Sequence, residues 1–137
     1  MKYSLKGITT EELSFKKTTV KIEPGQKIEI KPKFSREVKT LIANKSIKFV
    51  NLTVKVESTE TEPKPFEIIV SLTGVYETDI PDDFSEKKFV VEATKEIYAY
   101  LRASVNNLTA LSFVSPFVLP SLSEPLFPED RIEAFMN

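Results

Sequence analysis

The sequence predicts an α+β fold in which a four-stranded antiparallel sheet is followed by a long helix and a short C-terminal helix. Two patterns carry this prediction. In several segments before residue 78, apolar residues alternate with polar ones, and from residue 85 onward they recur at steps of three and four. Pro, Gly, Asn and Asp separate the early segments and mark turns between them.

The first two strands differ in the strength of their signal. A weak strand is expected over 5–16, where Leu13 and Phe15 are in phase. A longer strand is expected over 28–42, because the even positions 28, 30, 34, 38 and 42 are apolar and most odd positions between them are polar. Pro32 inside it indicates an edge position or a bulge, since proline cannot donate a ladder hydrogen bond.

The third and fourth strands have clearer patterns. The segment 47–57 alternates well except at Ile47 and Phe49, which predicts a bulge or register change near Phe49. The segment 66–77 has one strongly apolar face, interrupted only by Gly74, and a second face that is partly apolar. Both of its faces are therefore expected to contact other parts of the protein.

The second half of the chain is expected to be mainly one helix. It should begin with Ser85 as its N-cap and continue for about seven turns to Leu111. The prolines of 112–120 predict an extended apolar connector, and a short last helix is expected to begin near Pro128.

Composition excludes several kinds of chemistry. The chain has no Cys and no His, so it lacks disulfides, thiol nucleophiles, imidazole catalysis and the usual zinc ligands. With only 3 Gly it has no phosphate-cradling loop, and no cofactor or catalytic activity is expected. The net charge of -1 and the lack of a basic stripe argue against nucleic-acid binding.

Length and hydrophobic patterning also predict the domain organisation and the cellular location of the protein. A chain of 137 residues fits a single domain over 1–137. The N-terminal segment has no apolar signal core, and no apolar run is long enough to span a bilayer. We therefore expect a cytoplasmic protein with no direct membrane insertion.

Four short stretches occur in a characteristic order. They are Leu-Ser-Phe at 13–15, the strand 66–76 ending in Gly-Val-Tyr, Ile-Tyr-Ala-Tyr-Leu-Arg at 97–102, and Leu-Pro-Ser-Leu at 119–122. In this order the sequence resembles the SecB family of export chaperones and its SecB-like relatives. Ala99 stands where the family has a helix proline, and the chain lacks the family's acidic character.

The resemblance implies a fold, an assembly and a client site. The fold would be a four-stranded sheet with a long helix, assembled as a homo-oligomeric dimer of dimers. Unfolded or precursor polypeptides would lie in apolar grooves whose matching wall residues are Phe66, Ile68 and Val70. The alternative is that these three residues form core beneath the helix, as one face of any such sheet does.

The connector carries the second part of the predicted client site. Phe113 and Phe117 belong to a run of large apolar residues that neither a helical nor a strand period explains. The run is expected to be a partly exposed flap that contacts clients. The alternative is a stretch packed on its own subunit.

The resemblance also implies a surface for a protein partner. In export chaperones, acidic residues on the outer sheet face contact the SecA motor; here Glu12 and Glu67 are acidic. Lys16 and Ile69 occupy positions where the family usually has acids, which weakens complementarity to SecA. This difference favours general holding, or protection of a specific partner such as an antitoxin.

The expected function is therefore that of an ATP-independent holdase, a chaperone that binds unfolded polypeptides for export or for the protection of one partner. A structural or assembly protein, with its apolar faces consumed in a fixed oligomer, is the alternative. Enzymatic activity is the third class and is the least compatible with the composition.

Overall fold

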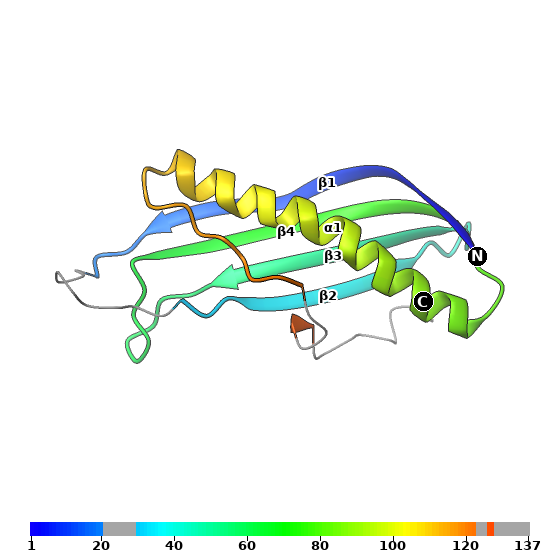
Figure 1. Ribbon diagram of the computed structural model, residues 1–137, viewed down its shortest axis with the longest axis horizontal. Coiled ribbons are helices and arrows are strands. Elements are labelled where there is room, and N and C mark those ends of the chain that lie inside the picture. The colour runs from blue at the N-terminus through cyan, green and yellow to red at the C-terminus, as the bar shows by residue number, and fades with distance from the viewer. Residues whose placement is uncertain (21–29, 123–125, 128–137) are drawn as a thin grey trace.

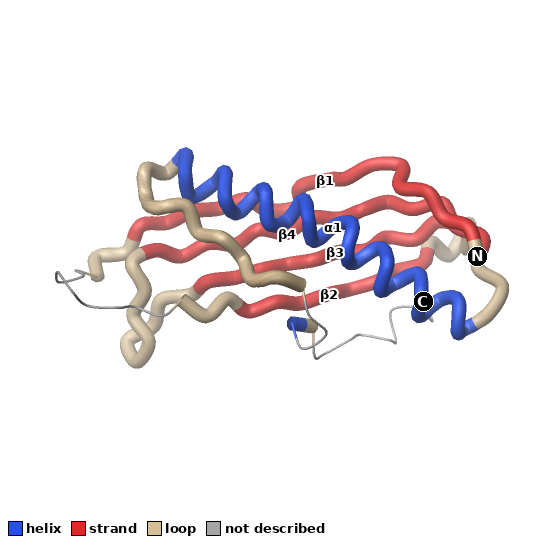
Figure 2. The backbone as a smooth tube through the Cα atoms, in the orientation of Figure 1, coloured by secondary structure: helices blue, strands red, loops and turns tan. Residues whose placement is uncertain are grey.

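The computed structural model describes residues 1–20, 30–122 and 126–127. In this part of the chain, four antiparallel strands form one sheet in the order β1-β4-β3-β2, and a long helix crosses one face of it (Figures 1 and 2). The elements are β1 (Lys2–Lys17), β2 (Lys33–Thr40), β3 (Ile47–Val56), β4 (Phe66–Asp79) and α1 (Asp83–Leu111). The predicted fold class is confirmed, except that the expected helix near Pro128 lies outside the described residues.

The second strand is shorter than predicted. β2 begins directly after Pro32, so the proline precedes the strand instead of lying inside it. At its other end the chain turns: the Leu41 amide donates to the Ile47 carbonyl, and Asn44 Oδ1 accepts from the Ser46 amide. This turn leaves Ile42 outside the strand and 82% exposed. The prediction had extended the strand to residue 42 because Ile42 is apolar and in phase with the alternation.

The predicted bulge near Phe49 is wrong. β3 pairs in unbroken register with both β2 and β4, and Ile47 and Phe49 lie half-buried on the face away from the helix. The irregularities are instead in β1, where register shifts occur between Leu5 and Gly7 and between Thr10 and Glu12. β1 is also longer at both ends than the predicted 5–16.

The helix begins earlier than predicted, and its N-cap lies three residues before the predicted one. Asp82 has extended backbone geometry, and its Oδ1 accepts a 2.7 Å hydrogen bond from the Ser85 amide. Ser85 is therefore inside the helix and is not the N-cap. Asp83 and Glu86 lie in the first turn, where their negative charges interact favourably with the positive end of the helix dipole and stabilise the helix.

The core lies between α1 and the inner face of the sheet. Even-numbered residues of β3 and β4 face the helix and are buried, while odd-numbered residues form the outer face. Gly74 lets the helix approach closely, since a Cβ there would lie 2.5 Å from Ile97 Cδ1. Asn51, Thr53 and Ser71 form a hydrogen-bonded polar cluster at the centre of the outer face.

Candidate functional site

The predicted groove residues are core residues in the isolated chain. Ile68 and Val70 are 0% exposed and Phe66 is 5% exposed, so these side chains line no open groove in the isolated chain. Of the two interpretations offered by the sequence, core beneath the helix describes their position. The alternation of apolar and polar residues in the sequence of β4 had correctly placed all three on one buried face of the strand, which is the face toward the helix.

Two aromatic rings from different parts of the chain cover Phe66. The Phe15 ring of β1 stacks on it with centroids 5.6 Å apart. The Phe117 ring of the connector lies on it at 6.3 Å and is tilted by 59°. Phe117, a predicted client-contact residue, therefore covers Phe66, another predicted client-contact residue. No pattern in the sequence had linked these two residues.

The connector starts from a strained turn. Helix α1 ends in a Schellman motif, in which the Val114 amide donates to the Thr109 carbonyl and the Phe113 amide to the Ala110 carbonyl. Phe113 takes the left-handed position of this motif with a φ of 61°, where glycine is usual. Its side chain is 97% exposed, so no packing offsets the backbone cost.

From this turn the connector runs back beside α1 over the helix-bearing face of the sheet (Figure 1, orange). Phe117 is half-buried, Val118 is exposed and Leu119 is only 1% exposed. Alternate side chains thus face the core and the solvent, as they do in an extended strand. The predicted flap is partly exposed and partly packed on its own subunit.

Two side-chain hydrogen bonds hold the connector to the helix. The Phe117 amide donates to Thr109 Oγ1 at 2.9 Å, and Tyr98 donates its hydroxyl to the Pro120 carbonyl at 2.5 Å. Burial raises the pKa of the Tyr98 phenol, and the smaller opposing effect of Arg102 does not cancel this. The hydroxyl therefore stays protonated and able to donate at neutral pH.

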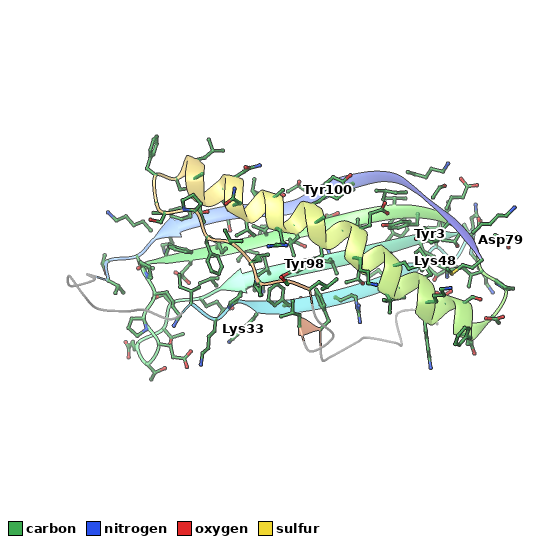
Figure 3. The ribbon with its side chains drawn as sticks, viewed as in Figure 1. Tyr3, Lys33, Lys48, Asp79, Tyr98 and Tyr100 are labelled. Carbon is green, nitrogen blue, oxygen red and sulfur yellow. The ribbon has the colours of Figure 1, made fainter. Side chains whose placement is uncertain are left out.

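Tyr98 and Tyr100 extend to opposite sides of α1 (Figure 3). Tyr98 is buried beside the connector, whereas Tyr100 is half exposed.

Phe127, one of the two described residues beyond position 122, packs in a second aromatic cluster. Its ring lies 5.7 Å from Phe34 and 6.3 Å from Tyr98, and the Arg36 guanidinium sits 5.1 Å above it. A groove of about 530 Å³ adjoins the cluster, bounded by Arg36, Tyr98, Leu122 and Phe127 among others. Phe127 follows no period in the sequence, so reasoning from the sequence missed this cluster.

A larger groove of about 880 Å³ opens between the β2–β3 turn and the β4–α1 loop. Leu41, Ile42 and Ile80 supply apolar walls, and Lys48 and Glu86 form an ion pair within its lining. This groove mixes apolar and charged groups and was not predicted from the sequence.

The predicted partner surface lies on the outer face of the sheet. Glu12 is opposite Ser71 in the register, and Lys16 is opposite Glu67. Ile69 lies on the same face between them. The acidic side chains therefore share this face with a lysine and an apolar residue.

Within the described ranges, no three Asp or Glu side chains are grouped so that they could hold a metal ion. The helix of the described part is also too polar to be a candidate for crossing a membrane.

No protein-family model matches the sequence, and no curated protein matches it at a significant level. Among solved structures, the chain is similar to the Mycobacterium tuberculosis SecB-like chaperone Rv1957, solved in complex with a ChAD peptide from the Rv1956 HigA1 antitoxin. The TM-score is 0.72 and the sequence identity 16%, with 90% of this chain and 92% of that chain covered. The chain therefore has the SecB-like fold that the four sequence stretches implied.

Proposed function

We propose that this protein is a holdase that binds unfolded polypeptide segments through apolar surface at the end of α1 and along the connector. A fold hosts many functions, so the proposal rests on a site. The observation that carries it is the group of solvent-facing apolar side chains around the turn after α1. These are Leu111 at 77%, Phe113 at 97% and Val118 at 60% exposure.

The strained turn supports this proposal physically. A phenylalanine in the left-handed position costs backbone energy and, when fully exposed, gains no packing energy in return. Such a residue is retained more readily if its ring contacts something outside the chain. An apolar, chemically unselective surface is what a binder of many unfolded sequences needs.

Protection of a specific partner is the branch that we favour. The related chaperone was solved with an antitoxin peptide, so an antitoxin segment is one client that fits the proposal. SecA is a less suitable partner, because Lys16 and Ile69 interrupt the acidic character of the outer face. Cytoplasmic location and a non-catalytic role belong to the same proposal.

The test uses Phe113→Gly, which removes the exposed ring and relieves the backbone. We expect the free energy of unfolding to stay unchanged or to rise by up to about 1 kcal/mol. Suppression of aggregation of an unfolded test protein should fall at the same time. Ile42→Ser is the control, because it removes another highly exposed apolar side chain, at 82% exposure, from the β2–β3 turn. Equal holding by Phe113→Gly and the wild type would contradict the proposal.

A fixed oligomer without client binding is the second candidate. The exposed apolar residues Leu13, Phe84 and Leu111 on β1 and α1 favour contact with further copies of the chain. A protein can both bind unfolded clients and assemble as a dimer of dimers, so assembly and client binding must be measured separately. Sedimentation at micromolar concentration reports assembly, while aggregation suppression reports holding. An assembled protein that suppresses no aggregation would favour the structural role.

A further inference from the structure

The connector is bound to its own sheet in the manner of an extended peptide ligand. Phe117 and Leu119 point inward as two anchors spaced by two residues, and Val118 between them is exposed. Extended peptides captured by sheet proteins place alternate side chains in the same way. The segment therefore resembles a client that belongs to the chain itself.

Few polar contacts hold this segment. Within 115–122, all of which the structure describes, no backbone-to-backbone hydrogen bond forms. Pro116 and Pro120 have no amide hydrogen to donate. The attachments are the Phe117 amide on Thr109, the Pro120 carbonyl on Tyr98, and apolar contacts. A segment held by two backbone-to-side-chain hydrogen bonds and apolar contacts can detach without breaking a strand ladder.

We propose that the connector occupies part of the client groove in the free protein, and that a captured polypeptide displaces it. The Phe117 ring then occupies the place on Phe66 that an apolar client side chain takes after displacement. This proposal rests on the holdase function and accounts for the burial of Phe66. The released connector would add its apolar side chains to the surface already exposed around Phe113.

A tethered competitor sets a threshold for binding. Because the connector is covalently attached, its effective concentration at the groove is on the order of millimolar. Only the fraction of molecules with the groove open binds client, so the apparent affinity falls by that fraction. Clients with several well-spaced apolar side chains exceed this threshold, whereas isolated apolar residues on folded proteins do not.

The experiment pins the connector covalently. The chain has no Cys, so Thr109→Cys with Phe117→Cys introduces the only two thiols. Their positions are adjacent, since Thr109 Oγ1 lies 2.9 Å from the Phe117 nitrogen. Oxidation fixes the segment, and reduction frees a connector that lacks its Phe117 anchor. The probe is reduced, carboxymethylated α-lactalbumin, which stays unfolded and has no free thiols.

We expect the reduced variant to bind this probe about tenfold more tightly than the oxidised variant. Equal affinity in the two states, with binding retained, overturns the displacement proposal and leaves the holdase function standing. Absence of binding by the wild type and by both states overturns the holdase function, and the displacement proposal with it.

A second pair of variants does not depend on disulfide formation. Tyr98→Phe removes the hydrogen bond to Pro120, and Tyr100→Phe removes a hydroxyl from the half-exposed ring on the other side of α1. Tyr98→Phe should bind the probe more tightly than the wild type, while Tyr100→Phe should match the wild type. Unchanged or weaker binding by Tyr98→Phe would show that the connector does not compete with clients.

Discussion

Lys48 of β3 and Glu86 of the first turn of α1 form an ion pair, with Nζ 2.9 Å from Oε1 and side chains only 9% and 17% exposed. Lys48 also donates a 3.0 Å hydrogen bond to Thr40 Oγ1. Lys48 is buried on the helix-bearing face of the sheet, so its charge needs this partner. The pair joins the sheet to the start of the helix.

Lys48→Met should lower the free energy of unfolding by about 3 kcal/mol, because Glu86 is left charged and largely buried. Adding Glu86→Leu should recover most of the loss, since a buried pair can often be replaced by apolar residues. Urea denaturation of the wild type, both single variants and the double variant gives the coupling energy. Additive losses would mean that the two side chains do not stabilise each other.

The close approach of Ile97 to Gly74 leads to a second prediction. Gly74→Ala places a Cβ 2.5 Å from Ile97 Cδ1 and 3.0 Å from the Tyr76 ring, which should destabilise the fold by about 1–3 kcal/mol. Ile97→Val removes the Cδ1 atom and should relieve part of this overpacking. Thermal unfolding of the four variants tests the interaction. If Ile97→Val brings no relief in the Gly74→Ala background, the helix does not pack as described.

Ile68→Ser tests which kind of site β4 provides. The side chain is fully buried, so the variant should lose about 2–5 kcal/mol through the cavity and the unpaired hydroxyl. Ile42→Ser, at an exposed position, should change stability by less than about 0.5 kcal/mol. Urea midpoints make the comparison. A near-native midpoint for Ile68→Ser, together with lost holding, would restore the predicted open groove.

Tyr76 makes stability depend on alkaline pH. Burial raises the pKa of its phenol well above the usual range, and the 2.7 Å hydrogen bond to Glu96 and the charge of that carboxylate raise it further. An unfolded tyrosine titrates near pH 10, so above that pH the folded state retains a proton that the unfolded state releases. This contribution is complete below about pH 10 and is lost as the pH rises beyond it.

The wild type should therefore lose up to about 1.4 kcal/mol per pH unit above pH 10 from this group. Tyr76→Phe should be less stable at pH 8, having lost the hydrogen bond, but should have a shallower slope between pH 10 and 11. Equal slopes in the wild type and Tyr76→Phe would exclude Tyr76 as the source.

The outer face gives a prediction about partners. Lys16→Glu with Ile69→Glu would place two acids beside Glu67, and should strengthen binding to the basic, zinc-bearing tail of SecA. Titration calorimetry at low and high salt measures the effect, which should diminish as salt screens the charges. Unchanged binding at low salt would show that this face does not correspond to the SecA surface.

Local periodicity was sufficient for much of the fold. The alternation over 66–77 identified β4 and its buried face, and the change of period located the N-cap of α1 to within three residues of its observed position. A period identifies the buried face but does not identify what covers it. Phe66 is covered partly by Phe117, which belongs to a segment without a period, so the sequence left core and groove as open alternatives.

Register errors have a similar origin. Each shift in β1 depends on one extra residue in a strand whose exposed face tolerates many side chains, so neither left a signal in the pattern. Ile42 gave a false signal, because its parity matched β2 while the turn at Asn44 had already ended the strand.

The two shifts in β1 also bear on fibril formation. β1 is an outermost strand, and an outermost strand presents backbone groups on which further chains can pair. The shifts divide it into the regular stretches Lys2–Leu5, Gly7–Thr10 and Glu12–Lys17. Because a bulge twists and interrupts an edge, a further chain that pairs with β1 finds only short regular stretches at this side of the sheet.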